Sequence, residues 1–295
     1  MWHPIALLHV SARLSWTTFT VHPSTVIGLV ALAALYTWRW RLPSHVILSP
    51  SASAQDDRRR TQNDTGKPPL FGASLALMFL SLNGWLHDLS DSYLFSAHMI
   101  QHLVLAMAVA PLMIMGTPGW MLRPLLRVRA FDAFGRFVSR PIPAFAIFNV
   151  VLIGWHLPPL YNAAMEYHDL HIVQHLLLLA ASVIMWWPVL SPMSELPRLS
   201  YPGQILYLFL MTIPMSIISA SIAYSDHILY PFYASAPRVL HLSPMEDQMI
   251  GALIMWIPGG LYLFGIISVI FYKWQKSGGH DSRESAQVGL AAAKS

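Results

Sequence analysis

The chain has 295 residues, of which 55% are hydrophobic and only 11% are charged. Soluble domains carry about 25% charged residues, so this composition indicates an integral membrane protein rather than a soluble one. No cysteine is present, which excludes disulfides, thiolate metal sites and metal transfer through thiols. The formal net charge of +4 does not indicate a nucleic-acid partner, and we expect none.

Seven long stretches contain no aspartate, glutamate, lysine or arginine. Each reaches the roughly 20 residues that a helix needs to cross the bilayer core. Backbone groups cannot stay unpaired in hydrocarbon, so each stretch is expected to hold a helix. The stretches are Leu14–Trp38, Pro68–His87, Ser92–Leu122, Pro141–Met165, Leu170–Ser194, Leu199–Ser225 and Gln248–Tyr272. The predicted fold class is all-α, a polytopic membrane protein with seven transmembrane helices.

Lysine and arginine are distributed unevenly between the two sides of this helix array. Of the 18 basic residues, 16 fall after the first, third, fifth and seventh helices, and only Arg13 and Arg238 fall on the other side. Because cytoplasmic loops are enriched in basic residues, the N-terminus is predicted outside and the C-terminus in the cytoplasm.

The chain is expected to form one membrane domain with polar extensions. Residues 1–19 are predicted to be an N-terminal extracytoplasmic segment, residues 20–273 the seven-helix domain, and residues 274–295 a disordered cytoplasmic tail. The linker 49–69 is rich in Ser, Asp, Arg and Pro, which is typical of a flexible segment.

A five-residue motif recurs along the chain. His98-Met-Ile-Gln-His102 is followed 73 positions later by His171-Ile-Val-Gln-His175, and 74 positions after that by Met245-Glu-Asp-Gln-Met249. Each copy opens a long apolar run. Because each period adds two spans, the sequence predicts one helix followed by three parallel two-helix repeats. The motif then lies at the outer end of the third, fifth and seventh helices.

Histidines at positions i and i+4 share one face of a helix, about 6 Å apart along its axis. Ionisable residues inside a membrane are costly and tend to be functional, so the paired histidines predict a metal site. The main candidate ligands are His98, His102, His171 and His175. Candidates of second rank are His87, His156, Met245, Asp247 and Met249. Gln101 and Gln174 are expected to orient ligating rings through their second nitrogen.

The residue types restrict the metal. Neutral imidazole suits zinc, copper, iron and nickel, whereas thioether selects Cu(I), so Met245 and Met249 favour copper as Cu(I). If Asp247 is the ligand instead, Cu(II), zinc and iron fit equally well. The simpler interpretations are that methionine only packs, and that Asp247 is a helix N-terminal charge.

Recognisable catalytic motifs are absent. Neither histidine pair is a zincin motif, because Met99 and Ile172 stand where that motif needs glutamate. No GxSxG, phosphate-binding loop or GxGxxG occurs. We therefore predict no catalytic residue and a protein that is not an enzyme.

Several short motifs together resemble a known family. They are Leu94-Phe-Ser-Ala-His98-Met-Ile-Gln-His102, Pro111-Leu with Gly116-Thr-Pro, Trp155-His156-Leu-Pro158 with Tyr161, His171 and His175 with Trp186-Trp187-Pro188, and Ser243-Pro244 with Asp247-Gln248 and Met255-Trp256. In this combination the chain resembles the CtaG family of seven-helix cytochrome c oxidase assembly factors. The resemblance implies a factor that helps a haem–copper oxidase mature, by helping copper reach its catalytic subunit.

The resemblance also implies a location and partners. The protein is expected to be a multi-pass protein of the bacterial inner membrane. Its expected partners are the catalytic subunit of cytochrome c oxidase, membrane lipid and a periplasmic copper carrier.

Other functions stay open at this stage. One is an intramembrane zinc hydrolase in which Asp88, Asp91 or Asp247 acts as base on metal-bound water. Another is a haem-binding membrane protein, and a third is a chaperone for oxidase subunits whose histidines serve only docking. Metal content, lipid turnover and a Soret band distinguish them.

Overall fold

The computed structural model describes residues 19–42 and 67–292, with side chains through Ser277. All regular structure in these ranges is helical, which confirms the all-α prediction. The helices are α1 (Pro23–Arg41), α3 (Pro68–Ser81), α4 (Gly84–Ser92), α5 (Phe95–Val104), the π-helix η2 (Leu105–Val109), α6 (Ala110–Gly116), α7 (Gly119–Leu122), the 3₁₀-helix η3 (Arg123–Arg127), α8 (Arg129–Val138), α9 (Pro141–His156), α10 (Pro158–Glu166), α11 (His168–Leu190), α12 (Tyr201–Ala223), α13 (Pro231–Ser235) and α14 (Pro244–Ala292).

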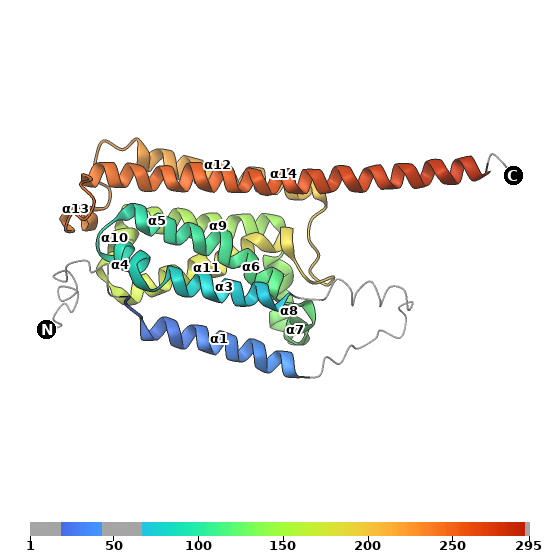
Figure 1. Cartoon of the computed structure of the whole chain (residues 1–295), viewed down its shortest axis with the longest axis horizontal. Helices are drawn as coiled ribbons and strands as arrows, with labels where there is room; N and C mark the ends of the chain where they lie inside the picture. Colours follow the sequence, from blue (N-terminus) through green and yellow to red (C-terminus); the bar gives the residue numbers. More distant parts are fainter. Residues whose placement is uncertain (1–18, 43–66, 293–295) are drawn as a thin grey trace.

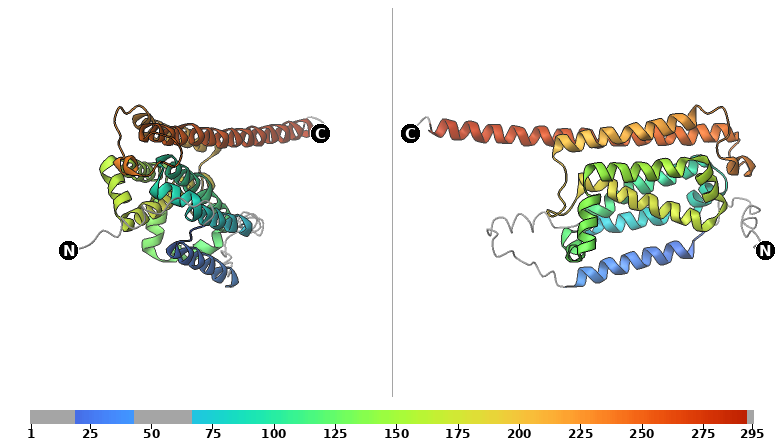
Figure 2. Two further views of the ribbon diagram at one scale, coloured as in Figure 1. Left: turned by 60° about the vertical axis from the view of Figure 1, so that its left-hand side comes forward. Right: turned by 180° about the vertical axis from the view of Figure 1, so that it is seen from behind.

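The long helices run side by side along one direction (Figure 1). α12 and α14 pack together on one side, the middle contains α3, α5, α6, α9 and α11, and α1 lies against α3 on the opposite side (Figures 1 and 2). The short helices α4, α10 and α13 gather at one end of the array, and α7 and α8 lie at the other. The two ends therefore differ in structure as well as in charge.

Four described segments are long and apolar enough to cross a membrane. They are Phe95–Gly116, His168–Leu190, Tyr201–Ala223 and Pro244–Ser277. Two bent helix pairs, α3 with α4 and α8 with α9, raise the number to six if each pair is one span. The protein is thus a multi-pass membrane protein by length and composition, and the seventh span stays a prediction.

Proline and glycine explain why two predicted spans are bent or split. α9 ends at His156 because Leu157 precedes Pro158 and is extended, with φ −67° and ψ 129°. α3 and α4 meet at 48°, and Gly84 begins α4 with a φ of +67° that other residues rarely adopt. The stretches Pro141–Met165 and Pro68–His87 are therefore not single straight helices.

The helices of each predicted hairpin are neighbours. α3 packs against α6, α9 against α11, and α12 against α14. These three pairs are the second with the third, the fourth with the fifth, and the sixth with the seventh of the predicted spans. The symmetry that relates the three hairpins stays a prediction.

A π-helical turn interrupts the central span Phe95–Gly116. In the π-helix Leu105–Val109, backbone hydrogen bonds join a carbonyl to the N–H five residues later. The Ala106 carbonyl would therefore need the N–H of residue 111, which is proline and has none. Trp186 of α11 supplies the missing donor, with Nε1 2.8 Å from the Ala106 oxygen. The turn is therefore stable inside the array, and it joins α11 to the α5–α6 span.

α14 approaches α5 closely at Gly251. A Cβ on Gly251 would lie 2.4 Å from Cδ1 of Phe95, so a larger residue would push the helices apart. This contact brings the start of α14, with the third copy of the motif, against the start of α5.

α8 has the pattern of an interfacial helix. Phe131, Phe134 and Phe137 are exposed at three-residue spacing, and the same helix carries Arg129 at its start and Arg136 near its end. A phenylalanine face beside basic residues is typical of a helix that lies along a membrane surface.

Parts of the predicted domain organisation fall on residues that are not described. The extracytoplasmic segment 1–19 and the linker 49–69 lie almost wholly outside the described residues. α14 continues as helical backbone to Ala292, through most of the stretch 274–295 for which we expected disorder. No proline follows Pro258, so every later residue of α14 has the backbone N–H that a helical hydrogen bond needs.

Candidate metal centre

The start of α5 is held in place by a carboxylate from another helix. Asp247 of α14 accepts hydrogen bonds from the backbone N–H of Phe95 (2.7 Å) and of Ser96 (3.1 Å), and from the Ser96 hydroxyl (2.5 Å). Free N–H groups at a helix N-terminus favour such a negative partner. This contact positions the first turn of α5, which contains His98.

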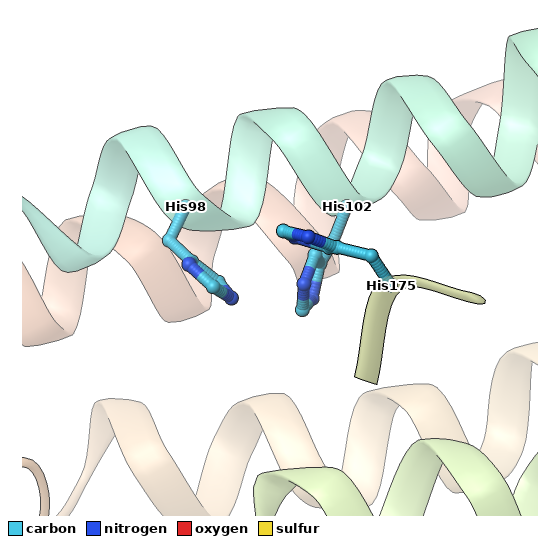
Figure 3. Close-up of side chains that lie close together, drawn as sticks. All are labelled: His98, His102 and His175. Carbon is cyan, nitrogen blue, oxygen red and sulfur yellow. The ribbon is translucent and has the colours of Figure 1, made fainter. Parts of the chain in front are cut away.

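Four histidines from two helices converge behind this turn. His98 and His102 come from α5, and His171 and His175 come from α11. Ring centroids lie 4.1 Å apart for His98 and His102, 5.2 Å for His102 and His175, 5.4 Å for His98 and His171, and 4.5 Å for His171 and His175. Figure 3 shows His98 and His102 extending from one helix toward His175 on the other side.

His98, His102 and His171 are buried and His175 is half-buried, and most of the ring nitrogens have no hydrogen-bond partner among the described residues. His98 is fully buried, and neither of its ring nitrogens makes a hydrogen bond. The same holds for both nitrogens of His102 and for Nε2 of His171 and of His175. Buried polar groups without partners are costly and rare. The unpaired imidazole nitrogens are a donor set that zinc and copper both accept.

The ligand atoms form two overlapping sets. In one set the nitrogens of His98, His102 and His175 lie within 4.8 Å of one another. In the other, Asp91, His98 and His171 meet the same limit. Nitrogens bound to one zinc ion at about 2.0–2.1 Å are at most about 4.2 Å apart. Small side-chain rotations would therefore bring the ligand atoms of either set within bonding distance of one ion.

The second-rank histidines lie beside this cluster. The His156 ring lies 6.4 Å from that of His102, its Nδ1 is 2.7 Å from the Leu152 carbonyl, and its buried Nε2 has no partner. His87 of α4 lies 3.2 Å from Gln101 through Nδ1 and 3.3 Å from Asp91 through Nε2. His156 thus has a nitrogen to offer a metal ion, whereas both nitrogens of His87 already have neighbours.

The third copy of the motif is placed differently. Both carboxylate oxygens of Asp247 bond the start of α5, and Met249 is 42% exposed. Met245 is partly exposed, and Glu246 forms a capping box with Ser243 at the start of α14. Asp247 therefore caps the N-terminus of α5, whereas we expected it to act at the N-terminus of its own helix, α14. The described contacts of Met245 and Met249 do not favour thioether ligation.

The glutamines of the repeat connect helices more than they orient ligands. Gln101 donates to the Ser81 carbonyl at 2.7 Å, and its Oε1 lies 3.0 Å from the Ser90 hydroxyl. Gln248 accepts from the Leu229 N–H at 2.8 Å. Gln174 is fully buried, and neither polar atom of its amide has a hydrogen-bond partner within residues 19–42 and 67–277.

Asp91 is the residue whose importance the sequence did not indicate. It was only a candidate base in one alternative, yet its Oδ2 lies 3.3 Å from His87 and 3.5 Å from His171. Its spacing of four from His87 on α4 was the available signal, because that spacing places both on one face.

A buried phenol supports the backbone next to Asp91. Tyr233 of α13 donates to the Ser90 carbonyl at 2.7 Å, and the Tyr161 hydroxyl lies 3.2 Å from that of Tyr233. Burial raises the pKa of Tyr233, so its hydroxyl remains a donor at neutral pH. α13 thus holds the end of α4 in position.

Comparison with known proteins gives this geometry a context. The family model described as cytochrome c oxidase caa3 assembly factor matches residues 53–277. An uncharacterized protein of Mycobacterium bovis is 26% identical over 204 residues, 63% of this chain and 30% of its own length. An uncharacterized protein of Mycobacterium leprae is 25% identical over 223 residues, 68% of this chain and 33% of its own. The chain spans about a third of the length of these relatives, and no solved structure matches.

The match covers most of the chain, including both histidine pairs and the start of α14. It confirms the resemblance that the motifs predicted. The chain belongs to the cytochrome c oxidase caa3 assembly factor family.

Proposed function

We propose that the protein binds a copper ion in the histidine cluster and passes it to a haem–copper oxidase during assembly. The observation that carries this proposal is the convergence of His98, His102, His171 and His175 with buried, unpartnered nitrogens. Membership of the oxidase assembly family supplies the recipient. In this role the protein binds and transfers an ion and catalyses no reaction.

The choice of copper rests on the family and on donor chemistry. Imidazole nitrogens bind Cu(I), Cu(II) and Zn(II). The exposure of Met249 weakens the thioether argument for Cu(I), and the hydrogen bonds of Asp247 weaken the argument that it is a carboxylate ligand. We retain copper because a haem–copper oxidase needs it, with either oxidation state as the form that is bound.

We further propose seven spans, with the N-terminus outside and the cluster on the extracytoplasmic side. The supporting observations are the basic residues grouped after alternate spans and the position of α7 and α8 at the end away from α4, α10 and α13 (Figure 1). α8 then lies on the cytoplasmic surface of the inner membrane. The cluster would face the compartment of a periplasmic copper carrier.

One observation favours a second candidate, a zinc-dependent intramembrane hydrolase. A ligand set of Asp91, His98 and His171 with room for water would resemble a catalytic zinc site, in which three protein ligands leave one position open. Zinc as the bound metal, together with lipid hydrolysis lost in Asp91→Asn, would favour this alternative.

Metal content of the purified full-length protein tests the proposal. After loading with Cu(I) under reducing anaerobic conditions, or with Cu(II), we expect about one copper per chain in wild type, and loading with Zn(II) tests the alternative metal. His98→Ala should lose it, because His98 belongs to both ligand sets. His241→Ala is the matched control, because His241 is exposed and belongs to neither ligand set. Equal copper in all variants would contradict the site.

A cellular measurement tests the recipient. In a strain that lacks the protein, oxidase activity and the copper content of the purified oxidase should fall. Wild type and His241→Ala should restore both, and His98→Ala should not. Restoration by His98→Ala would leave the family role in place and remove metal transfer from it.

A further inference from the structure

The two ligand sets share His98, and they lie at different depths. His98 and His171 stand in the first turn of α5 and α11, whereas His102 and His175 stand one turn further along. One turn of four residues corresponds to about 6 Å along a helix axis. One set therefore lies nearer the end of the array that contains α4, and the other lies deeper between the helices.

The first set contains a carboxylate that is partly exposed, whereas the second set contains imidazoles only. The side chain of Asp91 is 21% exposed, whereas that of His171 is 7% exposed and His98 is fully buried. In the deeper set, both nitrogens of His102 and Nε2 of His175 are buried. A cation that arrives from solution thus meets the Asp91 carboxylate before it meets any buried imidazole.

The histidines around Asp91 support a path on which a cation reaches Asp91 before the buried imidazoles. His87 lies on one side of the carboxylate and His171 on the other, and the ring of His22 lies 4.3 Å from that of His87. These side chains lead from the start of α1 to the cluster. They are not part of the set formed by His98, His102 and His175.

We infer that the centre is a two-position relay. A divalent cation binds first to Asp91, His98 and His171, and then moves one helical turn inward to His98, His102 and His175. His98 stays bound in both positions, so the ion remains attached to the protein while it moves between them. This inference rests on the proposed function, because it concerns the ion that the cluster binds.

The step is a ligand exchange without redox chemistry. The bonds to the Asp91 oxygen and to a His171 nitrogen break, and bonds to His102 and His175 form. The ion keeps its charge, and it exchanges one carboxylate and one imidazole for two neutral imidazoles. Carboxylate suits a hard or borderline divalent ion, so the outer position favours Cu²⁺ or Zn²⁺ over Cu⁺.

The Asp91 carboxylate, at the solvent side of the cluster, should change the rates of both capture and release of the cation. Lining an opening with one sign of charge raises association rates of the opposite charge by about 10–10³-fold. Since release follows the same path in reverse, loss of Asp91 should slow release as well. The affinity of the inner position should change little, because Asp91 is not among its ligands.

Stopped-flow mixing of the full-length protein with Cu²⁺, combined with electron paramagnetic resonance, tests the relay. Asp91→Asn should still bind one Cu²⁺ with nitrogen-only hyperfine structure, while capture and release to a chelator both slow by roughly tenfold or more. Asp91→Glu should restore much of both rates. His102→Ala should hold the ion in the outer position, with a mixed nitrogen and oxygen signal.

Asp88→Asn is the matched control. Asp88 is on the same helix, contacts Thr20 through both oxygens at 2.6 and 2.7 Å, and belongs to neither set. Unchanged rates in Asp91→Asn would overturn the relay and leave the metal site intact. Loss of stoichiometric binding in Asp91→Asn would also overturn it, by making Asp91 a ligand of a single site. Failure of wild type to bind any ion would overturn the proposed function and the relay together.

Discussion

The first turns of α5 and of α14 each contain a copy of the same motif. The middle and last positions of the motif differ between the copies, because the position that is buried in one copy is exposed in the other. In α5 the first and last residues of the motif, His98 and His102, are buried, and the middle residue Ile100 is 40% exposed. In α14 the middle residue Asp247 is fully buried and the last residue Met249 is 42% exposed. Residues two apart on a helix differ by about 200° in direction, so α14 is turned by roughly half a rotation.

The copy of the motif in α11 resembles the copy in α5 in the burial of its first and middle positions. His171 is buried, and the middle residue Val173 is 42% exposed. The histidine faces of α5 and α11 meet each other, and a site forms between them. The middle position of α14 faces α5 instead, and it stabilises the helix that contains two of the histidines. One motif thus supplies candidate ligands in two repeats and a structural carboxylate in the third.

The largest expected effect is on bound copper, and it distinguishes the histidine copies of the motif from the third copy. His98→Ala should reduce bound copper to a background level, because His98 belongs to both ligand sets. Met249→Ala should retain the wild-type amount. Metal analysis of purified proteins checks both, and a copper loss of equal size in Met249→Ala would show that the third repeat is a ligand after all.

Asp247→Asn should destabilise the protein without removing the metal from folded molecules. It removes the charge from a buried carboxylate that accepts three hydrogen bonds from α5. Hydrogen bonds to charged groups contribute about 1.5–3 kcal/mol each, and loss of a helix cap costs about 1 kcal/mol. Thermal unfolding in detergent measures this effect. Loss of copper with unchanged thermal stability would instead identify Asp247 as a ligand.

The two buried glutamines should differ in the same experiment. Gln101→Leu removes the bond to the buried Ser81 carbonyl and one of the bonds of the Ser90 hydroxyl, at a cost of about 1–3 kcal/mol. Gln174 has no hydrogen-bond partner among the described residues, so Gln174→Leu should be near neutral. A larger loss of stability in Gln174→Leu would indicate that its amide contacts the metal or its ligands.

Met249→Leu should have the smallest effect. The side chain is exposed, and the change keeps its size and apolar character, so the free energy of unfolding should change by less than about 0.5 kcal/mol. A thermal unfolding curve that overlays wild type is the expected result. A clear destabilisation would place the last position of this copy, Met249, in a packed interface.

Much of the fold followed from local patterns. Uncharged stretches predicted the helices, and α3–α6, α9–α11 and α12–α14 pack together as the predicted hairpins would require. The bends at Gly84 and at Leu157 were harder to place, because an uncharged stretch does not reveal where one helix ends inside it. The π-turn at Leu105–Val109 depends on Trp186, which is far away in the sequence.

The sequence by itself determined which residues share a helix face, and it singled out His98, His102, His171 and His175 as an unusual set. It also determined the family, because those motifs are local. Only the tertiary structure decided which face of each helix meets its neighbours, and so brought Asp91 beside His171 and turned Asp247 toward α5. The physical reason is that helical periodicity sets the angle between residues of one helix, whereas the rotation of each helix about its own axis depends on packing against the others.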